Sequence, residues 1–372
     1  MVILFIACFA GILFLLQNAL YSRLWMKGVS VRLSFSKEMV EAGDQASLIE
    51  VVENRKWLPL ATLKVKFQCS RNLKFLDTDN SAVTDLYYRN DLFTVMPFKR
   101  ITRTHKISCP QRGYFGIYGI DLVGADLFFS QEMRGHMESD TRIYVLPRQF
   151  SSSVLDSAMK KVSGEVAVRR YEIEDPFTHR GIREYEPYDE MKSINWKATA
   201  KTGELKVNVR DHTAVKSVRI FLNLQDTNIL RREELLEMSI SICARIVWEL
   251  LNQGVQTAVY ANAPDCMTGQ ILILEGITGG ESLNAVYKSL ARLDLKKETA
   301  DFGESFGDKL LLDNALYTVV ISPNRHEDFQ SLLVSYKEKE DFAWICPSKE
   351  MDDKDIMDKL KESVIMLQEE QV

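Results

Sequence analysis

The first apolar segment of the chain contains no charged residue from Val2 to Leu16, and Gln17–Tyr21 extends it to the ~20 residues that a membrane-spanning helix needs. Arg23 and Lys27 follow the segment, and no Lys or Arg precedes it. A secretory signal peptide has a positively charged start and a small-residue cleavage site, and this segment has neither. The pattern therefore predicts a membrane anchor over residues 1–22 rather than a cleaved signal. The charge bias predicts that the soluble part is cytoplasmic.

From residue 30 to residue 148 the pattern changes to strands. Runs such as VRLSFS, ATLKVKFQCS and TRIYVLP alternate apolar and polar residues or are rich in β-branched and aromatic types. Turn signals such as EAGDQ and YRND separate these runs. A period of two is typical of strands with one buried face. This segment predicts an antiparallel β-sandwich of about seven strands, similar in size to an immunoglobulin-type domain.

Strands and helices alternate over residues 218–370. VRIFLNL has the composition of a buried strand, and the next segment has apolar residues at helical spacing. Further strands are predicted at VQTAVYA, QILILEG, ALYTVVIS and FAWICP, and further helices at ESLNAVYKSLARL, HEDFQSLLVSYKEK and KDIMDKLKESVIMLQ. Such alternation predicts a mostly parallel, Rossmann-type sheet with helices on both faces. Residues 149–217 are interpreted as a densely charged connecting segment, so the chain as a whole is predicted to be an α+β multidomain protein.

Composition narrows the function classes. The formal net charge of the 372 residues is −5, and no long basic run is present, so a nucleic-acid partner is not expected. The cysteines are scattered and no pair has CxxC spacing, which argues against a zinc site and favours free buried thiols. They are Cys8, Cys69, Cys109, Cys243, Cys266 and Cys346.

The charged stretch from Arg183 to Val207, REYEPYDEMKSINWKATAKTGELKV, resembles the signature of the bacterial family called domain of unknown function 58. That signature is R-x-Y-x-x-G-D-x-x-R-x-I-x-W-x-x-x-A-R-x-G-x-L-x-V. The matching residues are Arg183, Tyr185, Asp189, Ile194, Trp196, Ala200, Gly203, Leu205 and Val207. Tyr188 replaces the usual Gly, and Lys192 and Lys201 replace Arg, which removes planar bidentate donors.

The resemblance implies a membrane-anchored protein that acts as a partner or adaptor of a MoxR-type AAA+ ATPase, with no enzymatic activity. The residues themselves fit an interaction role. Trp196 offers a large apolar surface and one N–H donor, as interface anchors do. Arg183, Asp189, Lys192 and Lys197 are expected to form a charged network around it. The alternative is that the signature only connects the β-domain to the α/β domain.

The α/β segment resembles a von Willebrand factor A domain, a family that often binds Mg²⁺ through an Asp-x-Ser-x-Ser motif, a Thr and an Asp. Loops that follow strands place such ligands at one edge of a sheet. The positions that match here are Asn223, Gln225, Thr227, Glu281 and Ser322. Because the motif carboxylates are replaced, we expect a degenerate site without metal that serves as a protein-contact face.

These observations predict a non-enzymatic, membrane-anchored adaptor without a cofactor that works with a MoxR-type ATPase in assembly, envelope or stress processes. Two alternatives remain. One is a metal-dependent adhesion-type receptor that holds Mg²⁺ through Asn223, Thr227 and Glu281, with its soluble part outside the cell. The other is a hydrolase that uses Asp189 with His179 or His212, although no GxSxG, HExxH or P-loop lysine is present.

Overall fold

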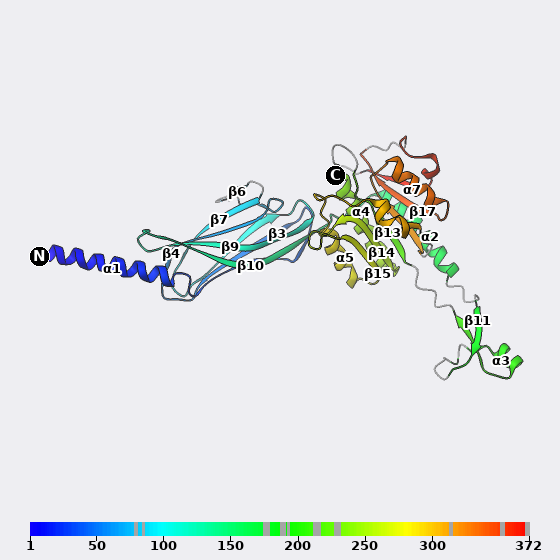
Figure 1. Ribbon diagram of the computed structural model, residues 1–372, viewed down its shortest axis with the longest axis horizontal. Coiled ribbons are helices and arrows are strands. Elements are labelled where there is room, and N and C mark those ends of the chain that lie inside the picture. The colour runs from blue at the N-terminus through cyan, green and yellow to red at the C-terminus, as the bar shows by residue number, and fades with distance from the viewer. Residues whose placement is uncertain are drawn as a thin grey trace. The chain divides into compact units, whose positions relative to one another are not determined.

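The computed structural model divides the chain into two compact units, each described here by itself (Figure 1). Unit 1 comprises Met1–Gln149 with Tyr287–Leu293, and unit 2 comprises Phe150–Val286 with Asp294–Val372. The structure describes residues 1–77, 81–83, 86–173, 179–186, 191, 194–210, 217–226, 232–311, 315–349 and 354–368.

Unit 1 is a long N-terminal helix followed by two packed β-sheets. One sheet has the strand order β1-β3-β8-β5 and the other β2-β10-β9-β4-β7-β6. The pairs are antiparallel apart from β2 and β10. The elements are α1 (Val2–Leu24), β1 (Val29–Phe35), β2 (Met39–Glu41), β3 (Gln45–Asn54), β4 (Leu60–Ser70), β5 (Lys74–Phe75), β6 (Ser81–Val83), β7 (Leu86–Val95), β8 (Arg100–Ser108), β9 (Gly113–Ala125) and β10 (Glu132–Leu146).

The period-two pattern accounts for the sandwich. Along β3 and β7 every second side chain is buried, so each strand turns one face to a shared apolar core that includes Leu48, Val65 and Ile120. The β-sandwich predicted over residues 30–148 is confirmed in this coarse form. The described residues form more strands than predicted, because short pairings such as β2 and β5 give little signal in the sequence.

The C-terminal end of α1 belongs to the core of the sandwich. Tyr21 and Trp25 are almost fully buried there, and the Tyr21 hydroxyl donates to the main-chain oxygen of Pro59 at 2.9 Å. The Trp25 ring lies directly against Gly124 on β9, where a Cβ atom would come within 2.8 Å of it. By contrast, residues 1–16 of the helix are exposed. The helix is long and apolar enough to span a membrane, as predicted.

Unit 2 contains a six-stranded sheet with the order β15-β14-β13-β16-β17-β18, parallel except for β15. Its central strands are buried along their whole length, as expected for a sheet covered on both faces. The elements are α2 (Ser153–Ile173), β13 (Val218–Leu222), α4 (Glu233–Asn252), β14 (Thr257–Pro264), β15 (Ile271–Ile277), α5 (Glu281–Ala291), α6 (Phe302–Leu311), β16 (Tyr317–Ile321), α7 (Glu327–Lys337), β17 (Phe342–Pro347), η2 (Asp358–Leu360) and β18 (Val364–Leu367).

Two predicted features of this unit need correction, and a third feature was missed. Residues 149–217 are not only a connection, because helix α2 packs against β16 and β18 with Leu155, Val162 and Val166 buried. The final helix predicted at KDIMDKLKESVIMLQ is instead the short η2 followed by strand β18. Pairing with β17 satisfies the backbone groups of that sheet edge, and this outweighs the local helical preference. The third feature, helix α6, was not predicted.

We predict that Gly124→Ala destabilises unit 1 by about 1–3 kcal/mol, because its Cβ would overpack against the Trp25 ring. Thermal or denaturant unfolding of the detergent-solubilised chain measures this effect. Gly164→Ala in α2 is the control: its Cβ would meet no atom within 4 Å, so we expect a small stabilisation of about 0.5–1 kcal/mol. Wild-type stability of Gly124→Ala would mean that Trp25 does not pack there.

Candidate functional site

The signature segment forms a small hairpin with a helical insertion. Strands β11 (His179–Glu184) and β12 (Lys206–Arg210) pair antiparallel, and α3 (Trp196–Thr202) lies between them in the sequence. Both ends of α3 are capped. The Asn195 side chain accepts from the Ala198 N–H at 2.9 Å, and Gly203 ends the helix with a φ of 75°. The caps explain why a short charged sequence without an apolar core face forms a helix here.

The hairpin turns apolar side chains outward. Ile194 and Val207, which form a β-bridge with each other, are buried, but Trp196 is 64% exposed. Other exposed apolar side chains of this segment are Ile182, Met191 and Leu205. Exposed apolar groups on an ordered hairpin are typical of a protein-contact surface.

Two members of the predicted charged network, Asp189 and Lys192, lie outside the described residues. Arg183 is placed 3.9 Å from Glu186, and its guanidinium donates to the main-chain oxygen of Glu184. Lys206 bridges two carboxylates across the hairpin, at 3.1 Å from Glu184 and 3.3 Å from Glu204. The sequence reading missed this bridge.

The other signature residues take ordinary positions in the hairpin. Tyr185 is half-buried, and its N–H donates to the Leu205 oxygen at 3.0 Å. Lys197, Ala200 and Lys201 are exposed on α3. Leu205 is also exposed, so an apolar signature position is open to solvent.

The carboxyl-terminal edge of the unit 2 sheet is built from amides and a hydroxyl. Asn223 follows β13 and Ser322 follows β16; both are fully buried. Asn262 of β14 donates to the Asn223 side-chain oxygen at 2.9 Å, and that oxygen also accepts from the Gln225 N–H. The Ser322 hydroxyl accepts from the Asn324 N–H at 3.1 Å. At this edge Asn223 and Ser322, which were predicted as metal-site positions, therefore form hydrogen bonds that stabilise the loops.

The topology does not bring Glu281 to this edge. Strand β15 is antiparallel to β14, and its last residue, Ile277, pairs with Thr257 at the start of β14. Glu281 begins α5 four residues later. It therefore follows the opposite edge of the sheet from Asn223, because the carboxyl ends of the parallel strands lie at the other end of β14. Thr227, another predicted ligand, lies outside the described residues.

Carboxylates do lie at the edge, but they accept hydrogen bonds from the backbone. Asp226 accepts from the Arg232 N–H at 2.7 Å, where α4 begins. Asp301 accepts from the Glu304 N–H at 2.9 Å, where α6 begins, and its other oxygen lies 3.3 Å from the Gln225 amide. Acidic groups at helix N-termini are stabilising. The sequence carried a signal for α6, since an Asp followed three residues later by Glu resembles a capping box.

An open pocket of about 940 Å³ lies beside this edge. Its charged lining mixes Arg232, Arg325, Lys349 and Lys354 with Glu327, Asp328 and Asp355. Arg325 donates to the Ser348 hydroxyl at 2.7 Å. A wide, polar pocket with both charge signs suits a polar polypeptide segment better than a small apolar ligand.

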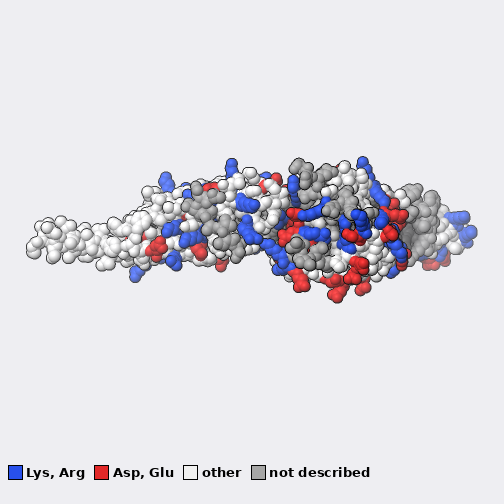
Figure 2. Space-filling model, turned by 90° about the horizontal axis from the view of Figure 1, so that it is seen from above, with Lys and Arg blue, Asp and Glu red and all other residues white. Residues whose placement is uncertain are grey.

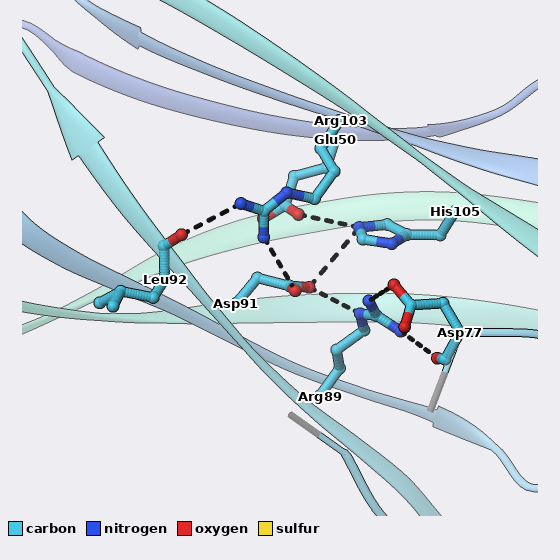
Figure 3. A network of polar contacts seen from close by, with 7 residues as sticks. All are labelled: Glu50, Asp77, Arg89, Asp91, Leu92, Arg103 and His105. Carbon is cyan, nitrogen blue, oxygen red and sulfur yellow. Dashed lines mark hydrogen bonds and ion pairs between the residues drawn. The ribbon is translucent and has the colours of Figure 1, made fainter. Parts of the chain in front are cut away.

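A second cluster, the buried network, lies between the two sheets of unit 1 (Figure 3). Arg89 and Asp91 on β7 face Glu50 on β3 and His105 on β8, and all four are buried. Arg89 donates to Asp91 at 2.7 Å, and Arg103 donates to the other oxygen of Asp91 at 3.1 Å. The network therefore links both sheets through charged groups.

Ligand atoms of Glu50, Asp91 and His105 lie within 4.8 Å of one another, close enough to hold a metal ion. The surrounding charges favour another role. Both oxygens of Asp91 already accept hydrogen bonds from guanidinium groups, and the two positive charges of Arg89 and Arg103 would repel a divalent cation at this place. The donor set therefore fits an ion-paired network better than a metal centre.

Glu50 holds its proton more tightly than a solvated glutamate does. Burial raises the pKa of its carboxyl group, the hydrogen bond with His105 opposes this shift, and the nearby Asp91 adds to it. The guanidinium groups of Arg89 and Arg103 pair with the carboxylates of Asp91 and Asp77, and a proton on Glu50 spares the network a further buried negative charge. A neutral carboxyl group has the smaller desolvation penalty.

The hydrolase hypothesis depends on groups that are not placed. Asp189, His212 and the side chain of His179 lie outside the described residues. It stays a hypothesis.

The chain matches no protein-family model. The uncharacterized protein YeaD of Bacillus subtilis (strain 168) is 21% identical over 251 residues, which cover 66% of this chain and 59% of YeaD. The CARDB domain of the PF1109 protein from Pyrococcus furiosus is 13% identical, covers 32% of this chain and 96% of its own, and has a TM-score of 0.22. A non-cellulosomal cohesin from Archaeoglobus fulgidus is 11% identical, with coverages of 31% and 91% and a TM-score of 0.21.

We predict that Arg89→Met lowers the stability of unit 1 by about 3–5 kcal/mol, because it leaves the carboxylate of Asp91 buried with one cation fewer. Arg100→Met is the control, since Arg100 forms a solvent-exposed pair with Glu53 whose loss we expect to change stability far less. Denaturant unfolding compares the two variants. Equal losses would contradict the structural role of the buried network.

A raised Glu50 pKa means that the folded chain binds this proton more tightly than the unfolded chain. The free energy of unfolding contributed by Glu50 therefore falls as pH rises from the ordinary value of 4.5 through the raised value. We expect Glu50→Gln to remove this fall, as measured by melting temperature against pH. Glu53→Gln is the control, because hydrogen bonding to Arg55 lowers the pKa of Glu53, and its contribution is lost only as pH falls. An unchanged slope in Glu50→Gln would refute the assignment.

Proposed function

We propose that the protein is a non-enzymatic, membrane-anchored interaction protein whose partner is a MoxR-type AAA+ ATPase. The observation that carries the proposal is Trp196, which is 64% exposed although its helix is capped at both ends. Leaving a tryptophan in water forgoes the free energy of burying it. A partner surface that covers Trp196 recovers that free energy.

The surroundings of Trp196 support the same reading. Ile182, Met191 and Leu205 add exposed apolar area, and Lys206 with Glu184 and Glu204 adds charge. An apolar centre with a polar rim is the usual composition of a protein interface. The resemblance of this hairpin to the signature of domain of unknown function 58 supports the MoxR-type ATPase as the partner.

Unit 2 supports a binding role rather than catalysis. Its strand order and the antiparallel β15 agree with a von Willebrand factor A-like arrangement. The side chains of Asn223 and Asn262 are hydrogen-bonded to each other where that family places an ion. The open pocket beside this edge offers a second surface for a polypeptide.

The membrane anchor and its sidedness complete the proposal. Helix α1 meets the length and composition required of a span. Arg23 lies in the last turn of α1 and Lys27 follows the helix, which favours a cytoplasmic soluble part and access to a cytoplasmic ATPase.

We expect Trp196→Ala to weaken binding of the detergent-solubilised chain to a purified MoxR-type ATPase by about 30-fold, the effect of removing an interface anchor. Trp57→Ala is the control, since Trp57 is similarly exposed, at 59%, but belongs to unit 1. Surface-immobilised binding gives both affinities, and circular dichroism checks folding. The proposal fails if folded Trp196→Ala binds as tightly as Trp57→Ala.

A further inference from the structure

We propose that unit 1 touches the bilayer a second time, through the exposed turn between β9 and β10. This inference rests on α1 as a membrane span and is independent of any partner of Trp196. The turn, called the apolar turn here, contains Leu127, Phe128 and Phe129, all exposed. The lipid would cover side chains that no described part of the chain covers.

The apolar turn lies along α1. The Phe14 and Phe128 ring centroids are 5.9 Å apart. Gln17 donates to the Asp126 carboxylate at 3.1 Å, and the Ser130 hydroxyl lies 3.1 Å from the Asn18 side-chain oxygen. The contact therefore extends from the core at Trp25 to Phe14, about 16 Å along the helix axis at 1.5 Å per residue.

The length of a membrane span fixes the depth of the turn. A helix needs about 20 residues to cross the hydrocarbon layer, and any stretch of about 20 residues in Val2–Leu24 includes residues 14–18. The apolar turn packs beside those residues. On the face drawn in Figure 2, the end formed by α1 is free of Lys, Arg, Asp and Glu. Even the span that ends earliest, residues 2–21, places residues 14–18 roughly 5–10 Å inside the end of the hydrocarbon layer, so a span by α1 brings the apolar turn among the acyl chains.

Backbone conformation gives independent support. Among the described residues, Phe98 and Phe129 are the non-glycine residues with positive φ, at 54° and 55°. Both are exposed phenylalanines, in positions where Gly or Asn would be less strained. Phe98 lies in the turn between β7 and β8. The Phe98 N–H donates to the main-chain oxygen of Lys56, and the Lys56 ammonium contacts the main-chain oxygen of Trp25. The Phe98 turn is therefore linked to the end of α1 through Lys56, whereas the apolar turn contacts α1 directly.

The buried carboxylate of the apolar turn is paired with groups of the same turn, which suits a turn beside lipid. Asp126 is buried, and its carboxylate accepts from the N–H groups of Ser130 and Gln131 at 2.7 and 3.0 Å. The Ser130 hydroxyl lies 2.7 Å from the same carboxylate. Leu127, Phe128 and Phe129 face outward, and Ser130 and Gln131 beside them are also exposed.

The test uses the full chain in phosphatidylcholine–phosphatidylglycerol vesicles that contain acyl-chain nitroxide lipid. An environment-sensitive fluorophore is attached to Phe128→Cys in a background that replaces the exposed Cys8 and Cys266 with Ser. Burial raises the pKa of Cys69 and Cys243 to about 12, so these thiols label slowly. Phe129→Cys provides a second probe of the same turn.

Two reference probes make the outcome decisive. Tyr118→Cys is the matched control: Tyr118 is 60% exposed and Phe128 61%, but Tyr118 lies seven residues before the end of β9, about 23 Å away. Native Cys8, restored alone, reports whether α1 is in lipid.

We expect strong quenching at Cys8 and at least roughly twofold more quenching at Phe128→Cys than at Tyr118→Cys. Quenching at Cys8 with equal, weak quenching at the Phe128, Phe129 and Tyr118 positions would overturn the second contact and leave the anchor intact. Absence of quenching at Cys8 would overturn the anchor and this inference together.

Discussion

The packing of the last turns of α1 into the β-sandwich is the constraint on which the rest of unit 1 depends. Tyr21 and Trp25 are core residues of the sandwich and not merely residues of a tether. Gly124 and Gly135 leave room for the Trp25 ring. A span that ends inside a folded core cannot swing freely, so a membrane that holds α1 also sets the height and tilt of the sandwich.

The same sandwich also encloses the charged side chains of the buried network. Its strands keep strict alternation, so Arg89 and Asp91 must point inward with Tyr87 and Phe93. Removing one partner of a buried ion pair is strongly destabilising, and this network joins residues of both sheets. The raised pKa of Glu50 makes the stability of this packing depend on pH.

The sequence carried the coarse fold because periodicity reports which face of a strand or helix is buried. The YRND stretch, interpreted from the sequence as a turn, is instead part of β7, and the period of two continues through it so that Arg89 and Asp91 point inward. Charged residues are usually taken as exposed, so the sequence interpretation missed this. The direction of β15 cannot be read from periodicity, and it alone moved Glu281 away from Asn223. Strand β18 was predicted as a helix, because its pairing with β17, an earlier part of the chain, leaves no local pattern in the sequence. The exposure of Trp196 could not be predicted from periodicity, because the short helix that carries it is defined by its caps at Asn195 and Gly203.

The most direct test of the central claim is a distance measurement between spin labels on α1 and on the sandwich of the full chain. Labels at Ala10 and Tyr118, in the background without exposed cysteines, report whether the two parts move as one body. The packing of Tyr21 and Trp25 predicts one narrow distance distribution that is the same in detergent and in bilayers. A broad distribution in both environments would show that α1 is a flexible tether.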